Sequence, residues 1–143
     1  MFGWFDSKNQ KVVKRWEREH VELVELATKV IEAYSKGDEK KVRTVLKELS
    51  GKTAHHLMSE DLEFFKMMKD QKRMTAKTEA LIKEFKESFS GVKVALMSFL
   101  KNYAEEGSTI DDKFFTEFNA IVDVLGERIK FEEDNLYIML HVK

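Results

Sequence analysis

Four residues of the types that bind metal ions fall on the apolar faces of the helices that this sequence predicts: His20, His56, Glu60 and Glu132. Such positions in a helical bundle normally hold aliphatic side chains. Burying an ionisable group is costly unless it binds a metal or pairs with another charge. Two imidazoles and two carboxylates suit iron, manganese or zinc, and an open coordination position could admit dioxygen or water. These residue types therefore predict a buried site that holds either a metal ion or a network of ion pairs.

The spacing of the four residues supports this interpretation. His56 and Glu60 are four residues apart, so they project from one face of a helix and can bind one ion together. His20 belongs to an earlier helix and Glu132 to the last one, with Arg128 one turn before it. Each helical residue adds about 1.5 Å of height, and counting from the expected helix ends places all five groups in a slab roughly one turn thick.

The composition favours the long helices that such a slab requires. The chain has 143 residues, which is the length of one domain, with no proline and only six glycines to interrupt helices. Charged residues (36%) are interleaved with hydrophobic ones (43%), as in amphipathic helices. A net charge of −1 argues against nucleic-acid binding. The lack of cysteine excludes disulfides, Fe–S clusters and thiolate zinc sites.

Apolar residues recur at the spacing of one helical face in four segments. We expect helices over about 8–35, 39–69 and 73–103, and a last helix that begins after the cap candidates Ser108 and Thr109 and ends near His141. Ser7 and Gln10 form a capping box for the first helix. Short connections favour antiparallel neighbours. The predicted fold is therefore all-α, an up-down-up-down antiparallel four-helix bundle that forms a single domain over residues 1–143.

Several inward positions of this predicted bundle bear on the site. The third helix is expected to turn Thr78 inward rather than its neighbour Glu79, and to contain Gly91 in its interior, at a cost of about 1 kcal/mol relative to alanine. In the last helix Arg128, Glu132 and Leu136 share the inner face, with Met139 beyond them. The further inward positions expected on the second and third helices include Met67, Met74 and Val92. His55 is expected to face outward, and His141 to lie in the last helical turn.

Parts of the sequence resemble hemerythrin-like domains. EHVEL at 19–23, YSKGD at 34–38 and HHLMSED at 55–61 resemble the first half of such a domain, and the spacing of His20 and His56 fits the family. The stretch ERIKFEEDNLY at 127–137 resembles its final helix, with Arg128 where a histidine is expected. The resemblance spans most of the chain.

The resemblance implies specific roles for the candidate residues. Complete members of the family bind two irons that are bridged by two carboxylates. His20 and His56 would be the histidine ligands of one iron. Glu60 and Glu132 (or Glu133) would be the bridging carboxylates.

The three histidines of the other iron have no counterpart in this sequence. The third helix offers Thr75 and Glu79 instead, and the last helix offers Arg128. Three outcomes therefore stay open: one metal ion with Arg128 supplying the second positive charge, a metal-free network of buried ion pairs with Glu60 and Glu132, or a carboxylate-rich two-metal site that uses Glu79. The expected cofactor is iron, as one ion, two or none.

A second family also shares features with the chain. VVKRW at 12–16, followed by Glu19 and by ELV at 22–24, resembles the first helix of the Rsd/AlgQ regulators, which bind the principal sigma factor of bacteria. The last helix of that family also has an arginine four residues before a glutamate, as Arg128 and Glu132 are here. This resemblance implies a metal-free regulator that binds a sigma factor or another protein.

Other classes of function lack support in the sequence. No phosphate-binding loop or nucleophile motif is present, so we expect a protein that binds or senses rather than an enzyme. No apolar run approaches the roughly 20 residues that span a bilayer, and the apolar start Met1–Phe5 is too short for a signal sequence, so we expect a cytoplasmic location. A partner protein could contact an exposed helix face or the short apolar arm of residues 1–7. The function expected is binding or sensing of iron or dioxygen at an altered hemerythrin-like centre.

Overall fold

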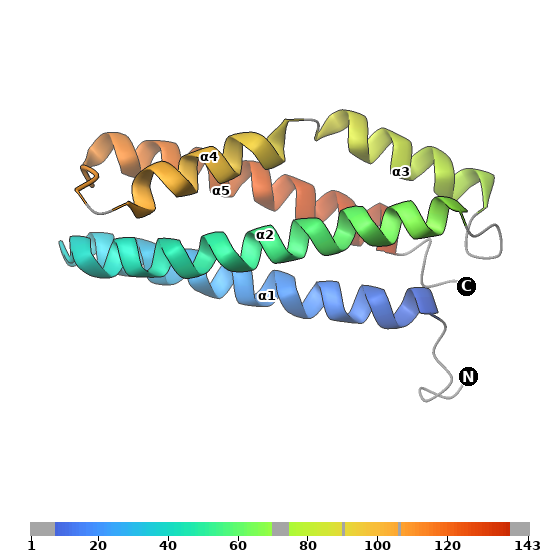
Figure 1. Ribbon diagram of the computed structural model, residues 1–143, viewed down its shortest axis with the longest axis horizontal. Helices are drawn as coiled ribbons and strands as arrows, with labels where there is room; N and C mark the ends of the chain where they lie inside the picture. Colours follow the sequence, from blue (N-terminus) through green and yellow to red (C-terminus); the bar gives the residue numbers. More distant parts are fainter. Residues whose placement is uncertain (1–7, 70–74, 90, 106, 138–143) are drawn as a thin grey trace.

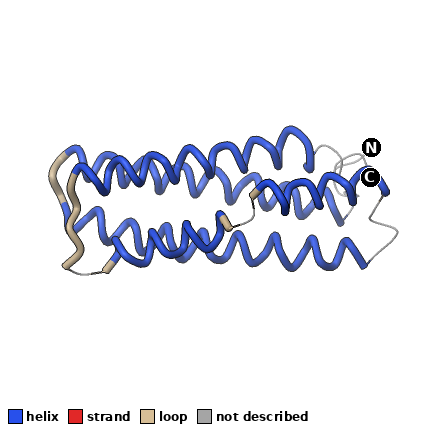
Figure 2. Tube along the Cα trace, turned by 90° about the horizontal axis from the view of Figure 1, so that it is seen from above, coloured by secondary structure: helices blue, strands red, loops and turns tan. Residues whose placement is uncertain are grey.

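Five α-helices and one π-helical turn make up the computed structural model, which describes residues 8–69, 75–89, 91–105 and 107–137. The helices are α1 (Lys8–Ser35), α2 (Glu39–Lys69), α3 (Ala76–Ser88), α4 (Val92–Ala104) and α5 (Asp112–Phe131), and α5 continues into the π turn Glu132–Leu136. Figure 1 shows α3 and α4 following one another along one edge of the bundle, above α2. The tube view contains helices and loops, with no strand among the described residues (Figure 2).

The helices alternate in direction along the bundle. α1 and α2 run antiparallel through a turn at Gly37, whose φ of 72° is readily adopted only by glycine. α3 and α4 then run opposite to α2, and α5 returns (Figure 1). The most extensive packing is that of α1 on α2 and of α2 on α4. The predicted all-α, up-down-up-down bundle is confirmed, and the first two helices have the predicted bounds.

The prediction of one continuous third helix is wrong. The structure divides it into α3 and α4, because Gly91 has a φ of 84°, which lies outside the right-handed helical region. α3 begins at Ala76 after a cap in which the Thr75 hydroxyl accepts a hydrogen bond from the Thr78 amide at 3.1 Å. The predicted start near Arg73 lies outside the described residues.

The predicted cap of the last helix is also wrong. Asp111, and not Ser108 or Thr109, caps α5 by accepting a hydrogen bond from the Phe114 amide at 3.1 Å. Ser108 instead donates from its hydroxyl to the Tyr103 carbonyl at 2.8 Å. Other predicted positions lie outside the part of the chain that the structure describes: Ser7, Met74, Met139, His141, the arm of residues 1–7, and the side chains of Met67, Val92 and Leu136.

The core consists of two hydrophobic clusters with a polar layer between them. The larger cluster extends from Leu23 to Ala33 on α1 and includes Phe114 and Phe118 of α5. The smaller one contains Val12, Val13, Trp16, Phe64, Ile82, Phe85 and Tyr137. His20 lies between the two clusters on α1, and Arg128 and Glu132 lie between them in α5 and the π turn. On α2 the buried polar residues are Thr53, His56 and Glu60, which surround Leu57 of the larger cluster and precede Phe64 of the smaller one. This layer contains the candidate site.

The helices also bear on the expectation about membranes. Within the described ranges, no helix combines the length and the apolar character that crossing a bilayer requires.

Candidate metal centre

The structure brings the four candidate ligands together in the polar layer. One ligand atom from each of His20, His56, Glu60 and Glu132 lies within 4.8 Å of the other three, and no other such group occurs among the described residues. The Nε2 atoms of the two histidines are 3.1 Å apart. His20 Nε2 lies 2.9 Å from Glu132 Oε1, and His56 Nε2 lies 3.2 Å from Glu60 Oε2. All four side chains are buried, so water does not compete with these contacts.

Two further carboxylates, those of Glu133 and Glu19, orient the imidazole rings of His20 and His56. His20 Nδ1 lies 2.9 Å from Glu133 Oε2, and His56 Nδ1 lies 2.6 Å from Glu19 Oε1. Metal-binding histidines usually donate their other ring N–H to such a partner, which fixes the tautomer. A neutral imidazole has only one N–H. With both Nδ1 atoms donating to carboxylates, the Nε2 lone pairs face each other and require a proton or a cation between them.

Arg128 lies on the other side of Glu60 and Glu132, which we call the two inner carboxylates. Its Nη2 donates to Glu60 Oε1 at 2.9 Å and its Nε to Glu132 Oε2 at 3.3 Å. The guanidinium also lies 4.8 Å from the centre of the Phe85 ring. Each carboxylate thus directs one oxygen to Arg128 and the other to a histidine. The two glutamates connect the cluster of ligand atoms to a positive charge that belongs to the protein.

Along α3 and α4, the described residues contribute no further ligand to this group. Glu79 and Thr75 are exposed, so the two-metal site that would use Glu79 is not supported. Thr78 is buried, as predicted, and Ile82 lies with Phe85 in the smaller hydrophobic cluster. His55, on the outside of α2, is exposed, as predicted.

Tyr137 also belongs to the centre, although the helical pattern did not reveal it. Its hydroxyl lies 3.0 Å from Glu60 Oε2, 3.0 Å from Glu132 Oε1 and 3.3 Å from His20 Nε2. An α-helix would place Leu136, four residues after Glu132, on the inner face. The π turn adds one residue, and the amide of Tyr137 donates to the carbonyl of Glu132, five residues earlier. The sequence offered one signal that Tyr137 belongs to the centre: a tyrosine buried in a helical bundle normally finds a polar partner for its hydroxyl.

The protons of this cluster are shared unequally. Burial would raise the pKa of Glu60, but hydrogen bonds and charges from His56, Glu132 and Arg128 outweigh it and lower that pKa to about 2. Burial, and then the charge of Glu60, raises the pKa of Glu132 well above its ordinary value. Burial would lower the pKa of His56, but Glu60 and Glu19 raise it overall. Without a cation, the pair of glutamates therefore retains a proton, which a cation would displace.

Burial, and then the charges of Glu60 and Glu132, also raises the pKa of the Tyr137 hydroxyl far above its ordinary value. The phenol therefore stays protonated as long as no cation offsets those charges.

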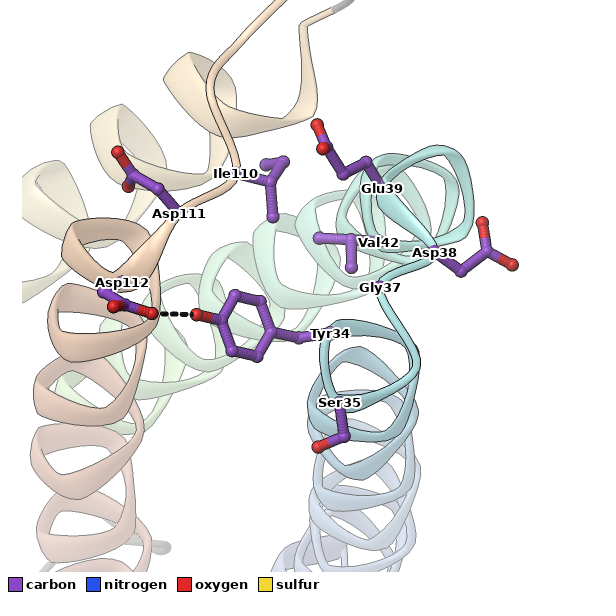
Figure 3. A pocket seen from close by; sticks show the side chains of 9 residues that line it. All are labelled: Tyr34, Ser35, Gly37, Asp38, Glu39, Val42, Ile110, Asp111 and Asp112. Carbon is purple, nitrogen blue, oxygen red and sulfur yellow. Dashed lines mark hydrogen bonds between the residues drawn. The ribbon is translucent and has the colours of Figure 1, made fainter.

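A surface pocket of about 480 Å³ lies at the other end of the bundle, between the end of α1 and the start of α5. There the Tyr34 hydroxyl donates to Asp112 Oδ1 at 2.6 Å (Figure 3). The other acidic side chains around this pocket, Asp38, Glu39 and Asp111, are exposed and spread apart instead of converging. This pocket has none of the features of the buried centre.

Comparison with known proteins agrees with the geometry of the centre. The model of the hemerythrin HHE cation-binding domain matches residues 11–140, which is most of the chain and includes every residue of the centre. Curated proteins and solved structures gave no match. The Rsd/AlgQ resemblance gains no support from these comparisons. A cation-binding role for the buried histidines and glutamates is the property that this family and this geometry share. The chain belongs to the hemerythrin HHE cation-binding family.

Proposed function

We propose that the buried centre binds a single iron ion and that the protein binds or senses iron or dioxygen. The observation that carries this proposal is the pair of imidazoles whose Nε2 atoms face each other at 3.1 Å while carboxylates hold both Nδ1 atoms. Two histidines and a carboxylate form the ligand set of many non-haem iron(II) centres. The roles proposed are histidine ligation by His20 and His56 and carboxylate ligation by Glu60 and Glu132.

Arg128 supports one ion rather than two. Its guanidinium takes one oxygen of each inner glutamate, where a second ion would require both carboxylates to bridge. A guanidinium stays protonated, so its positive charge offsets the carboxylate charge permanently. The residues present therefore fit one cation and do not fit a two-iron centre, and the proposal involves no second ion.

Thr53 supports a small ligand in the interior, about one helical turn from His56. It lies three residues before His56, on the same face of α2, and it is buried. Among the described residues, its hydroxyl oxygen is the buried side-chain polar atom without a hydrogen-bond partner. A hydroxyl left unsatisfied in the interior is costly unless something binds it. A water molecule or dioxygen held in the centre would supply that partner.

These contacts suggest separate roles for the ion and for the chain. Bound iron would supply the affinity for dioxygen and the redox chemistry. The chain orients the imidazoles through Glu19 and Glu133, offsets charge through Arg128, and excludes water by the two hydrophobic clusters. We therefore propose a binding or sensing role rather than catalytic turnover.

Metal analysis of the anaerobically purified chain tests the proposal, with two adjacent histidines as a matched pair. We expect about one iron per chain in the wild type, loss of iron in His56→Ala, and retention in His55→Ala, because His55 is exposed. A chain without metal, or one in which both substitutions leave the metal content unchanged, would contradict the proposal.

A metal-free regulator that binds a sigma factor or another protein is the second candidate. Two observations favour it: Arg128 already pairs with both inner glutamates, and Met58, Leu62 and Phe65 form an exposed apolar stripe on α2. In this case EDTA would leave both folding and partner capture unchanged. A pull-down that recovers no partner, together with bound iron, would exclude it.

A further inference from the structure

The Tyr137 hydroxyl lies among the same atoms that would hold the ion. Glu60 Oε2 and Glu132 Oε1 are each 3.0 Å from it, and His20 Nε2 is 3.3 Å away. Those three atoms are the ones that Glu60, Glu132 and His20 direct to the centre. The phenolic oxygen is therefore a fifth donor atom in the cluster, within 3.3 Å of the donor atoms of His20, Glu60 and Glu132.

A special backbone feature places this oxygen there. The π turn over Glu132–Leu136 inserts one residue, so that Glu132 and Tyr137 both face the centre although they are five residues apart. π turns are rare and occur frequently at functional sites, because they bring side chains onto a face that a regular helix would not offer them. The turn here serves to bring two oxygen donors to one point.

Aromatic neighbours hold the Tyr137 ring in place. The ring stacks on His20 with an interplanar angle of 13° and on Trp16 with one of 30°, each with centroids 5.7 Å apart. Only 1% of the residue is exposed, so its hydroxyl has neither water to bind nor room to turn away. The position of the oxygen is thus fixed by packing before any ion binds.

Without a cation, the two oxygen–oxygen contacts of Tyr137 need two protons between them. A phenol has one proton, but Tyr137 has two carboxylate oxygens at 3.0 Å, and only one of them can accept that proton. If Glu60 accepts it, the Tyr137 oxygen and Glu132 Oε1 repel each other unless Glu132 carries a proton of its own. A cation in the middle of these oxygens can replace both protons, because every donor atom can then direct a lone pair to it.

We propose that Tyr137 binds the ion as a phenolate, as a fifth ligand beside His20, His56, Glu60 and Glu132. This inference rests on the proposed iron-binding function. The hydroxyl proton leaves to solvent when the ion binds. Three anionic oxygens then face the ion, and Arg128 offsets one of their negative charges. Phenolate is a hard anionic oxygen donor, so its addition shifts the preference of the centre towards iron(III) relative to iron(II).

The test uses the full chain loaded with iron(III). A phenolate bound to iron(III) gives a charge-transfer band in the visible region and resonance-enhanced ring vibrations. We expect both in the wild type, both absent from Tyr137→Phe with its iron content retained, and both unchanged in Tyr103→Phe. Tyr103 is a matched control because its hydroxyl donates to Glu117 at 2.8 Å, away from the centre.

The outcomes separate this inference from the function on which it rests. A wild-type chain that holds iron(III) without the band, or a band that persists in Tyr137→Phe, overturns the ligand role and leaves iron binding intact. A wild-type chain that binds no iron overturns both. Where Tyr137→Phe fails to fold, ring-deuterated tyrosine in the wild type replaces it: the enhanced vibrations shift when a tyrosine is the ligand, and unshifted vibrations overturn the inference.

Discussion

Arg128 Nη2 donates to one oxygen of Glu60 at 2.9 Å, while the other oxygen of the same carboxylate lies 3.2 Å from His56. Glu132 is divided in the same way between Arg128 and His20. The two glutamates therefore lie between the fixed positive charge of Arg128 and the two histidines. Arg128 thus takes one oxygen of each glutamate, and both carboxylates would have to bridge in a two-cation centre of the kind that the family resemblance implied.

Replacing Arg128 by methionine should strongly destabilise the metal-free protein. The substitution leaves Glu60 and Glu132 buried with no permanent positive partner, and breaking a buried pair in this way costs about 3–5 kcal/mol. Urea unfolding in EDTA measures the loss. Lys93→Ala, which removes an exposed pair with Asp61, is the control and should cost less than about 1 kcal/mol. Equal losses in the two variants would show that Arg128 does not offset the buried charge.

The metal-free protein should become less stable as the pH rises through neutrality. Glu132 and His56 have raised pKa values, so the folded state keeps protons that the unfolded chain loses above about 4.5 and 6.5 respectively. For each proton that the folded state keeps and the unfolded chain loses, the free energy of unfolding falls by about 1.4 kcal/mol for every unit by which the pH rises. Urea unfolding in EDTA between about pH 6 and pH 8 measures this slope, and Glu132→Gln should reduce it.

At low pH, the stability of the metal-free protein should instead increase as the pH rises. The affinity for metal should also increase with pH. Glu60, with a pKa lowered to about 2, stabilises the fold above about 4.5, and this contribution is lost as the pH falls towards 2. Metal binding displaces protons, so metal affinity should rise with pH. A metal-free protein whose stability increases from about pH 6 to pH 8 would contradict the proton assignment in the centre.

The outer carboxylates should control affinity for the ion without controlling the fold. Glu19→Gln and Glu133→Gln weaken the acceptors that orient His56 and His20, and changes of this kind cost about 10–100-fold in metal affinity. A competition titration with a chelator measures the affinity. Glu25→Gln, on the exposed side of α1, should change nothing. Wild-type affinity in both variants would mean that Glu19 and Glu133 do not hold the two histidines in place for the ion.

Substitution by alanine should change the stability of the protein in opposite directions at two glycines. Gly91 has a φ of 84° at the break between α3 and α4, where a Cβ atom costs roughly 1–2 kcal/mol. Gly126 lies inside α5, and a Cβ added there meets nothing within 4 Å, so alanine should stabilise the protein by about 1 kcal/mol. Thermal unfolding separates the two. A neutral or stabilising Gly91→Ala would mean that the break is not set by the backbone of this glycine.

The sequence was sufficient for the bundle and for much of the cluster, because both follow from α-helical periodicity. The inner stripes placed His20 and His56 in the interior with Glu60, one turn after His56, and the structure buries all three. Periodicity fails where the backbone leaves the α-helix. Tyr137 was missed because the π turn moves the inner face from the fourth to the fifth residue after Glu132.

Two other features could not be read from apolar spacing. The break at Gly91 depends on a positive φ, which a glycine permits but does not require. The outer carboxylates Glu19 and Glu133 sit beside His20 and Glu132 in the sequence, and such charged neighbours occur throughout amphipathic helices. Only the side-chain geometry shows that they orient the two histidines.

Anaerobic calorimetric titration of the metal-free full chain with iron(II) tests the central claim most directly. A single buried cation site, with Arg128 in place of a second ion, predicts saturation at one iron per chain and no binding heat in a His20→Ala, His56→Ala double variant. Saturation at two irons per chain would contradict the role of Arg128, and an absence of binding by the wild type would contradict the metal centre itself.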